Sequence, residues 1–352
     1  MTCYHPLIRA EHRWKKKRAK DGHLYADYNI FSPNKLNKLE QIEDNQEYTY
    51  TLIPCGKCIG CRLEYSRQWA NRGFLESKYS EGNNWFVTLT YDKDHMPKKE
   101  EITTSDGITY WNDGSWNGTL MPEHLTKFIH DIRQYMKRHG NTEKIRYMAC
   151  GEYGEKGQRP HYHIIFFNLK LPADDLHMLK VNFEKDIYYR SDIIEHYWKN
   201  GYSLVTEANW NTIAYVARYI TKKINGEQSE HHYASKGQEK EFFRTSRKPG
   251  IAKKYYDENK DKIYEYNKIT ISNKGGVHTT APPRYYDQIL KKENPEFYEE
   301  RKKILKEQAK VRSKCKDMET SLERAFQLAI EERTQDQKNK ALKRAFEKST
   351  NK

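Results

Sequence analysis

Runs of aromatic and β-branched residues predict strands in the middle of the chain. Such side chains favour the pleated, half-buried surface of a sheet. The residues at 164–167 are apolar on both faces, which predicts that their strand lies in the interior of the sheet. The predicted strands are 85–91, 144–150, 161–167 and a segment near 202–207.

Apolar residues at helical spacing predict helices between these strands. Pro122 can open one of them, because the first turn of a helix needs no backbone N–H. Further helices are predicted at 62–79, near 189–199 and from about 209 to 225, with a turn-rich connection at 151–160 and an inserted loop at 104–118. The order predicts an α+β fold, with an antiparallel sheet flanked by helices. The apolar face after Pro122 consists of Leu125, Phe128, Ile129, Ile132 and Met136.

Changes in composition along the chain predict three parts. Residues 1–80 are basic, are expected to be irregular and carry a group of cysteines. Residues 81–285 contain the predicted sheet and form the expected central domain. Residues 286–352 are rich in Lys, Glu, Gln and Arg and contain no Gly, which predicts a charged tail that is helical or partly disordered.

The overall charge indicates a polyanionic partner. The 352 residues include 63 Lys and Arg against 49 Asp and Glu, giving a net charge of +14. Aromatic residues make up 13%, which is enough for a core and also suits base stacking. There is no run of about 18 apolar residues, so we expect no membrane partner. The first residues contain no apolar leader, and we therefore expect a cytoplasmic protein.

His161 and His163 predict a metal site. Side chains alternate along a strand, so both imidazoles point to the same face. Antiparallel pairing would bring the carboxylate of Glu152 near them. Two His and one carboxylate suit Mg²⁺ or Mn²⁺, with positions left for substrate oxygens. The alternatives are two ordinary edge-strand histidines and a solvated turn carboxylate.

Tyr215 and Tyr219 are candidate nucleophiles on the predicted helix from 209 to 225. They lie four residues apart, so their hydroxyls can reach one place. Lys222 follows one turn later and could help to stabilise a phenolate. We expect the tyrosines to lie away from the core, since an apolar stripe marks nearly the opposite side; the alternative is ordinary exposed tyrosines. That stripe consists of Ile213, Ala217, Ile220 and Ile224.

The cysteines at 55, 58 and 61 form a C-x-x-C-x-x-C pattern. Together with Cys3 they could bind a structural Zn²⁺ through four thiolates. An iron–sulfur cluster and three unliganded thiols are the alternatives. Disulfides are not expected in a reducing compartment.

Basic segments provide candidate phosphate contacts, although each is also compatible with an ordinary solvated surface. These segments are 13–18, 244–248 and 253–254.

Three of these segments resemble the motifs of the HUH endonuclease superfamily: WFVTLTY, GEYGEKGQRPHYHIIFF and YVARYITKK. The chain looks most like the rolling-circle replication initiators of microviruses, in particular the gokushovirus branch, over roughly residues 50–285. PCGKCIGCR and RPHYHIIFF are similar to segments of that branch. The histidine strand precedes the tyrosine helix, as in replication initiators. Arg218 stands where the best-known microvirus initiators have Lys.

The resemblance implies that residues 81–285 form an HUH endonuclease domain. Tyrosine transesterification at the origin of replicative-form DNA would leave a 5′-phosphotyrosine and a 3′-OH primer. The second tyrosine would then release a closed single-stranded circle. It implies viral DNA, host DNA polymerase and host helicase as partners, and the host cytoplasm as location. The chain contains no P-loop motif of its own.

Two other functions remain open at this stage. A non-enzymatic DNA- or RNA-binding protein would share the charge and the aromatic residues, but would not need a His pair facing a Tyr pair. A transposase of the same superfamily would act on element ends.

Overall fold

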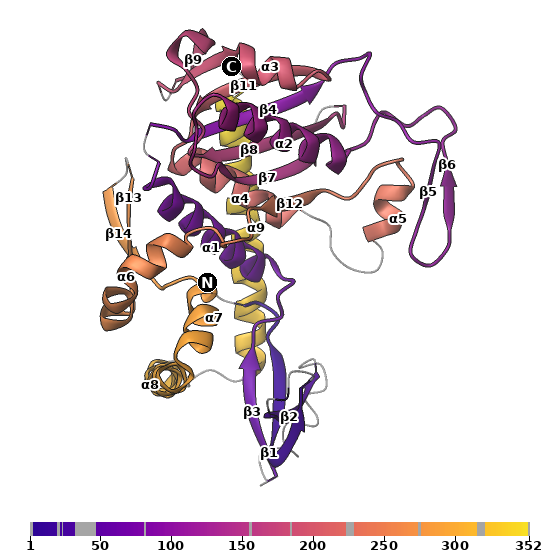
Figure 1. Cartoon of the computed structure of the whole chain (residues 1–352). Helices are drawn as coiled ribbons and strands as arrows, with labels where there is room; N and C mark the ends of the chain where they lie inside the picture. The colour runs from indigo at the N-terminus through magenta and orange to yellow at the C-terminus, as the bar shows by residue number, and fades with distance from the viewer. Residues whose placement is uncertain are drawn as a thin grey trace. The chain divides into compact units, whose positions relative to one another are not determined.

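The computed structural model describes residues 3–19, 22, 24–31, 47–80, 82–154, 157–183, 185–222, 229–273, 276–314 and 321–350 (Figure 1). The chain forms two compact units. One consists of Met1–Glu64 with Met318–Lys343, and the other of Tyr65–Asp317 with Arg344–Lys352. The three-part domain division expected from composition stays a prediction.

The first unit contains a three-stranded antiparallel sheet with the order β2-β1-β3. The expectation that residues 1–80 are irregular is therefore wrong. Alternate residues Ile8, Ala10 and His12 are buried, which is the period-two burial of a strand with one covered face. Only the first half of β1 shows this alternation, which explains why the basic second half conceals the strand. The strands are β1 (Leu7–Arg18), β2 (Leu24–Phe31) and β3 (Tyr48–Ile53).

The second unit is built on a seven-stranded sheet with the order β12-β7-β8-β4-β11-β10-β9. Every neighbouring pair is antiparallel, which confirms the predicted fold class. All four predicted strands are present, and β9, β10 and β12 add to them. The strands are β4 (Trp85–Tyr91), β7 (Arg146–Tyr153), β8 (Pro160–Phe167), β9 (Leu176–Val181), β10 (Ile187–Ser191), β11 (Gly201–Glu207) and β12 (Phe242–Thr245).

The two faces of this sheet carry separate hydrophobic cores (Figure 1). Helices α2 (Pro122–Arg138) and α3 (Asp192–Tyr197) contribute to one core, and all five apolar residues predicted after Pro122 are buried in it. Helices α1 (Ile59–Ser77), α4 (Trp210–Lys222) and α6 (Lys253–Tyr266) contribute to the other. The sheet is thus covered on both sides, as expected for a central strand such as β8.

Several boundaries differ from those predicted. The predicted helix near 189–199 begins as strand β10, and α3 starts only where the Ser191 hydroxyl accepts a hydrogen bond from the Ile194 N–H at 3.1 Å. The predicted loop at 104–118 includes part of a small hairpin, β5 (Glu101–Thr103) and β6 (Thr109–Trp111). Residues 246–251 are held by side chains of the sheet domain: Arg72 donates to the Ile251 carbonyl at 3.1 Å.

The charged tail is helical where it is described, as predicted. It comprises α7 (Arg284–Glu293), α8 (Pro295–Lys314) and α9 (Ser321–Thr350). Tyr286 and Leu290 of α7 are buried, and Tyr286 belongs to the second core. The remaining elements are α5 (Ser229–Ala234), the 3₁₀ turn η2 (Ala173–Asp175) and the ribbon β13 (Ile269–Asn273) with β14 (Gly276–Thr280). Among the described residues, no helix is long and apolar enough to cross a membrane.

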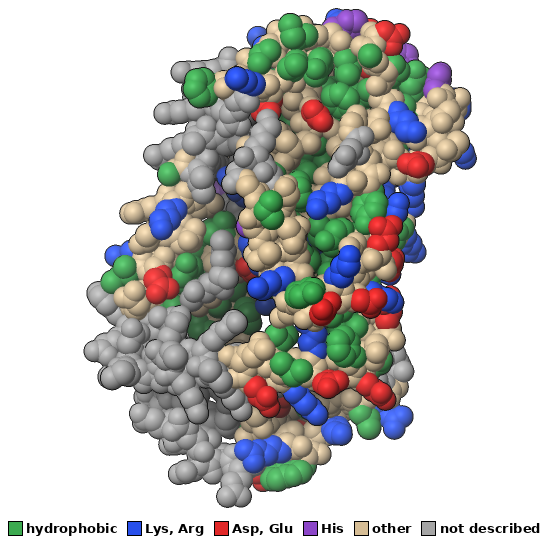
Figure 2. All heavy atoms as spheres, turned by 90° about the vertical axis from the view of Figure 1, so that its left-hand side faces the viewer, with side chains coloured by type: hydrophobic (Ala, Val, Ile, Leu, Met, Phe, Trp, Pro, Cys, Tyr) green, Lys and Arg blue, Asp and Glu red, His purple; other side chains and the backbone are tan. Residues whose placement is uncertain are grey.

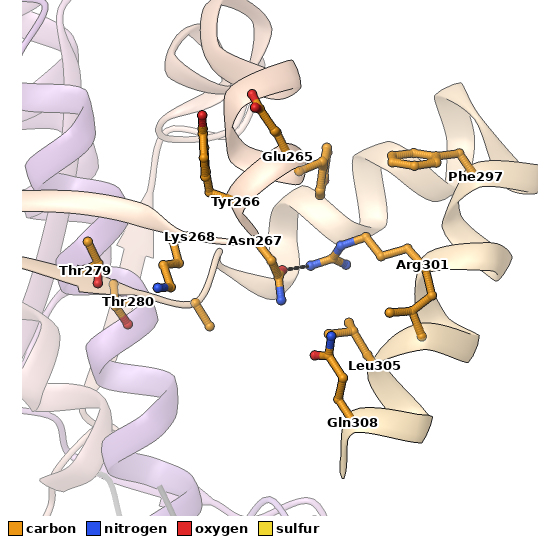
Figure 3. A pocket seen from close by; sticks show the side chains of 13 residues that line it. Glu265, Tyr266, Asn267, Lys268, Thr279, Thr280, Phe297, Arg301, Leu305 and Gln308 are labelled. Carbon is orange, nitrogen blue, oxygen red and sulfur yellow. Dashed lines mark hydrogen bonds between the residues drawn. The ribbon is translucent and has the colours of Figure 1, made fainter. Parts of the chain in front are cut away.

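A hollow of about 580 Å³ lies between the end of α6, strand β14 and helix α8 (Figure 3). Arg301 of α8 points into it and donates to the side chain of Asn267. The same guanidinium donates to Asp287 of α7 at 2.7 Å and lies 4.9 Å from the centre of the Tyr264 ring. Arg301 therefore connects three helices. None of the predicted catalytic or metal-binding residues lines this hollow.

Candidate metal and nucleophile site

The β7–β8 hairpin brings the predicted metal-binding residues together. Strand β7 continues to Tyr153, so Glu152 lies in the strand and not in the turn-rich connection expected at 151–160. In the antiparallel register, Glu152 is opposite His161 and Cys150 is opposite His163. Because side chains alternate, Glu152, His161 and His163 lie on one face of the sheet.

The three side chains converge at hydrogen-bond distance. Oε1 of Glu152 lies 2.8 Å from Nε2 of His161 and 3.0 Å from Nε2 of His163. Glu152 is only 3% exposed, which rules out the alternative of a solvated turn carboxylate. One nitrogen or oxygen from each of the three residues lies within 4.8 Å of the others.

Other groups orient the two imidazoles. Nδ1 of His161 can donate to the Arg159 carbonyl at 3.1 Å, and Nδ1 of His163 lies 3.0 Å from the Thr88 hydroxyl. Each ring thus directs Nε2 toward Glu152, an arrangement typical of metal-binding histidines, whose second nitrogen is held by an outer partner. Phe86 stacks on His163 with 5.5 Å between ring centroids.

The carboxylate of Glu152 is held in its ionised form. Burial by itself would raise the pKa of Glu152, but hydrogen bonds and charge interactions with His161 and His163 keep that pKa well below its usual value. A buried anion between two imidazoles is an electrostatic environment that favours a cation. The donor set of two nitrogens and one carboxylate therefore fits the divalent cation predicted from the sequence.

Helix α4 presents the two tyrosines to this cluster. It starts after a reciprocal cap, in which the Asn209 side chain accepts from the Thr212 N–H at 3.0 Å and the Thr212 hydroxyl accepts from the Asn209 N–H at 2.9 Å. The ring of Tyr215 meets His163 edge-on at 5.2 Å between centroids. Tyr219 stacks on the same imidazole at 5.4 Å.

The expectation that both tyrosines lie away from the core is wrong for Tyr219, which is 5% exposed. Ile213, Val216 and Ala217 are buried as well, so the buried arc of the helix is wider than its aliphatic stripe. The reason is that the site itself lies on the sheet face under α4. A tyrosine that points at the site is therefore also packed against the sheet. Ile224 and the side chain of Ile220 lie outside the described residues.

The two hydroxyls meet each other: Tyr219 donates a hydrogen bond to Tyr215. Tyr215 is only half-buried. Burial, with smaller contributions from the charge of Glu152 and from Tyr215, raises the pKa of Tyr219 well above its ordinary value. Tyr219 therefore holds its proton firmly, whereas Tyr215 accepts a hydrogen bond at the more open position.

Lys222 is the last residue of α4, but its side chain lies outside the described residues. Thr88 and Phe86, in contrast, were not singled out by the sequence. Both belong to β4, whose pairing with β8 aligns Thr88 with His163. The only available signal was the strand pattern of WFVTLTY, and a strand pattern does not reveal which strand lies beside it.

The four predicted cysteines also come together, in the first unit. The sulfurs of Cys55 and Cys61 are 3.9 Å apart, and those of Cys58 and Cys3 are also 3.9 Å apart. Thiolates bound to one zinc at about 2.3 Å in a tetrahedron have sulfurs about 3.8 Å apart. The spacing therefore fits Zn²⁺.

Backbone N–H groups support the same arrangement. The Cys55 N–H donates to the sulfur of Cys3 at 3.2 Å, and the Cys58 N–H donates to the sulfur of Cys55 at 3.3 Å. Burial would raise the pKa of Cys58, but backbone hydrogen bonds from Cys61 and Tyr4 lower it to about 7. The cluster connects the start of β1, the end of β3 and the start of α1.

We predict about one zinc per chain, measured by elemental analysis of protein purified without chelators. Cys58→Ser should lose the metal and lower the melting temperature, because binding of a structural zinc contributes to folding free energy. Cys150→Ala, which removes a buried thiol outside the cluster, is the matched control and should keep the zinc. Metal-free wild-type protein with an unchanged melting temperature would show that the thiols are unliganded.

The basic candidates differ in their surroundings. Lys253 pairs with Asp257 and with Glu293, so its charge is already used within the fold. The ammonium of Lys254 lies 4.5 Å from the centre of the Tyr79 ring. Arg244 donates to the Thr126 hydroxyl at 3.2 Å. Residues 13–18 of β1 are all exposed.

Comparisons with known proteins bear on this arrangement. A family model for the replication-associated protein ORF2 matches residues 84–224, the segment that contains the histidines, Glu152 and both tyrosines. The chain is 35% identical over 312 residues to the replication-associated protein ORF2 of Spiroplasma virus 4, which covers 87% of each chain. It is 30% identical over 305 residues to the replication-associated protein VP4 of Bdellovibrio phage phiMH2K, covering 85% of this chain and 82% of the relative.

A shorter match, 33% identical over 174 residues, links it to the replication-associated protein ORF4 of Chlamydia phage 1, covering 49% of this chain and 38% of the relative. No solved structure matches the chain significantly. The long matches cover most of the chain and of the relatives, and all three relatives are microvirus proteins. The chain therefore belongs to the family of microvirus replication-associated proteins.

Proposed function

We propose that this protein initiates viral DNA replication by cutting one strand at the origin of the double-stranded replicative form. One observation carries the proposal: two tyrosine hydroxyls, hydrogen-bonded to each other, pack on an imidazole of a buried His-His-Glu cluster. A nucleic-acid-binding protein without catalytic activity has no need of this combination.

Glu152, His161 and His163 would hold Mg²⁺ or Mn²⁺. A divalent cation bound there supplies Lewis-acid polarisation of the phosphate to be cut. The chain's own part is to keep the two Nε2 atoms and the carboxylate aligned, through Thr88, the Arg159 carbonyl and the register of β7 with β8. The buried position also limits access of water that could hydrolyse a covalent intermediate.

The chemical step is a transesterification. A tyrosine oxygen attacks the phosphorus, a new P–O bond forms to the tyrosine, and the bond to the 3′ oxygen breaks. The 3′ oxygen leaves as a 3′-OH once it has taken up a proton, and the 5′ phosphate stays on the tyrosine. One phosphoester replaces another, so that no nucleotide triphosphate is consumed. Lys222 is proposed to stabilise the phenolate that attacks.

The second tyrosine allows the product to be closed. After one round of synthesis it cuts the regenerated origin, and the newly released 3′-OH attacks the first phosphotyrosine. This reverse reaction restores a free tyrosine and joins the displaced strand into a single-stranded circle. The i,i+4 spacing of Tyr215 and Tyr219 lets both hydroxyls reach one phosphate in turn.

The remaining partners follow from this role. The 3′-OH would prime the host DNA polymerase, and a host helicase would unwind the duplex, because the sequence contains no P-loop ATPase motif. The substrates would be replicative-form and single-stranded viral DNA in the host cytoplasm.

The test is incubation of the full chain with a labelled single-stranded origin oligonucleotide and Mg²⁺ or Mn²⁺, followed by denaturing gel electrophoresis. We expect a band that migrates as a protein–DNA adduct and disappears in EDTA. Retardation in a native gel without an adduct would instead identify a binding protein. Cleavage at element ends rather than at the origin would identify a transposase.

A further inference from the structure

The outer half of strand β1 forms an exposed two-stranded ribbon with β2. Strand β3 pairs with β1 only from Leu7 to His12, whereas β2 continues to pair with Lys16, Lys17 and Arg18. From residue 13 to residue 18 every side chain of β1 is exposed, although the strand alternates between buried and partly buried residues before that point. The ribbon defined here comprises residues 13–18 and 24–27.

A β-bulge shapes this ribbon. The register passes from Glu11 opposite Tyr28 to Lys16 opposite Ala26, so residues 12–15 oppose a single residue of β2. Nδ1 of His12, which is 7% exposed, accepts hydrogen bonds from the N–H groups of Trp14 and Lys15 at 3.2 and 3.1 Å. The bulge is thus held from inside by a buried imidazole, and Trp14 is left 68% exposed.

Positive charge lies on both faces of the ribbon. Lys16 and Arg18 are two residues apart and share one face, while Lys17 points to the other, where it pairs with Asp27 at 2.6 Å. Lys15, Lys16 and Arg18 form no ion pair with any other described residue. Leu24 and Tyr25 of the facing strand are 57% and 37% exposed. At the end of the ribbon, at the bottom of Figure 2, Lys and Arg side chains lie beside hydrophobic ones.

We propose that this ribbon binds in a groove of duplex DNA. A groove of B-form DNA admits a two-stranded ribbon and offers a row of phosphates on either side of it. Cations on both faces of the ribbon match two such rows, and the exposed Trp14 provides an apolar contact to sugars or base edges between them. A flat surface of single-stranded DNA would engage only one face of the ribbon.

This site goes beyond the proposed catalytic function. It uses none of the residues assigned to cutting and lies in the first unit, outside the matched residues 84–224. Duplex binding by the ribbon can therefore hold or fail independently of whether Tyr215 and Tyr219 attack a phosphate.

The test measures affinity of the full chain for a duplex of about 30 base pairs of arbitrary sequence and for one of its single strands, by fluorescence anisotropy at several salt concentrations. The triple variant Lys15→Ala, Lys16→Ala, Arg18→Ala should bind the duplex roughly tenfold to a hundredfold more weakly near physiological salt, and lower the salt-dependence slope by about 2 to 3. The matched control removes three exposed lysines elsewhere: Lys291→Ala, Lys292→Ala, Lys303→Ala.

We expect the control variant to bind like the wild type, and single-strand binding to change less than duplex binding. Trp14→Ala should weaken duplex binding without changing the slope, because it removes no charge. Equal weakening by the control triple would reduce the effect to net charge. Weakening confined to the single strand, or no weakening at all, would also overturn the proposal. Cleavage of the single-stranded origin oligonucleotide, measured alongside, should persist in the ribbon variants.

Discussion

His161→Ala and His163→Ala are each expected to reduce strand cleavage by about a thousandfold or more, while duplex DNA binding stays within a few-fold of the wild type. Each substitution removes one of two imidazole nitrogens that lie within 3.0 Å of the Glu152 carboxylate. Affinity, in contrast, depends mostly on phosphate contacts elsewhere. The measurement is the initial cleavage rate of a labelled origin oligonucleotide with saturating Mn²⁺, beside an anisotropy titration.

Glu152→Gln sharpens this comparison, because it keeps the shape of the side chain and removes its charge. It should cleave as poorly as the histidine variants. Thr88→Val, which removes only the outer partner of His163, should cleave faster than any of them, and part of its loss should be recovered at higher Mn²⁺. If binding fell together with cleavage in all three ligand variants, the cluster would be a structural element of the sheet.

Replacement of both tyrosines by Phe is expected to abolish covalent attachment to DNA, whereas each single variant retains some. The two single variants should differ. Tyr215 is the less buried residue and accepts the hydrogen bond donated by Tyr219. We therefore expect Tyr219→Phe to keep most of the first attachment and Tyr215→Phe to keep little. Both should fail to release closed circles, since that step needs two nucleophiles.

The readouts are adduct formation on a single-stranded origin oligonucleotide and production of circular single strands from a plasmid carrying the origin. Tyr202→Phe is the matched control, because Tyr202 is 67% exposed on β11 and loses the same hydroxyl. One dead and one fully normal single variant, including normal circle release, would indicate a single nucleophile. An adduct in the double variant would place the nucleophile on another residue.

The sequence predicted the parts of the fold and site that depend on local patterns. The five apolar residues after Pro122 mark the buried face of α2, and the turn between 153 and 160 makes β7 and β8 neighbours. That hairpin was sufficient to bring Glu152 to the two histidines. The cysteine spacing likewise predicted the thiol cluster, with Cys3 joining from a distant part of the sequence.

What the sequence did not predict depends on contacts between distant segments. Thr88 and Phe86 reach His163 only because β4 lies beside β8, and strand patterns do not specify such pairing. Strands at exposed positions were also missed: β9 contains exposed His177 and Met178, so it shows no apolar alternation. Tyr219 was expected outside the core because the helical stripe counts aliphatic residues and not an aromatic ring that stacks on an imidazole.

The most direct test of the central claim is to identify the residue that carries the DNA. Wild-type protein is reacted with a short origin oligonucleotide and Mn²⁺, the adduct is digested with protease and nuclease, and the modified peptide is sequenced by mass spectrometry. We predict a phosphonucleotide on the peptide that contains Tyr215 and Tyr219, mainly on Tyr215. Attachment at any residue outside α4, or cleavage of the oligonucleotide with no covalent adduct at all, would contradict the account.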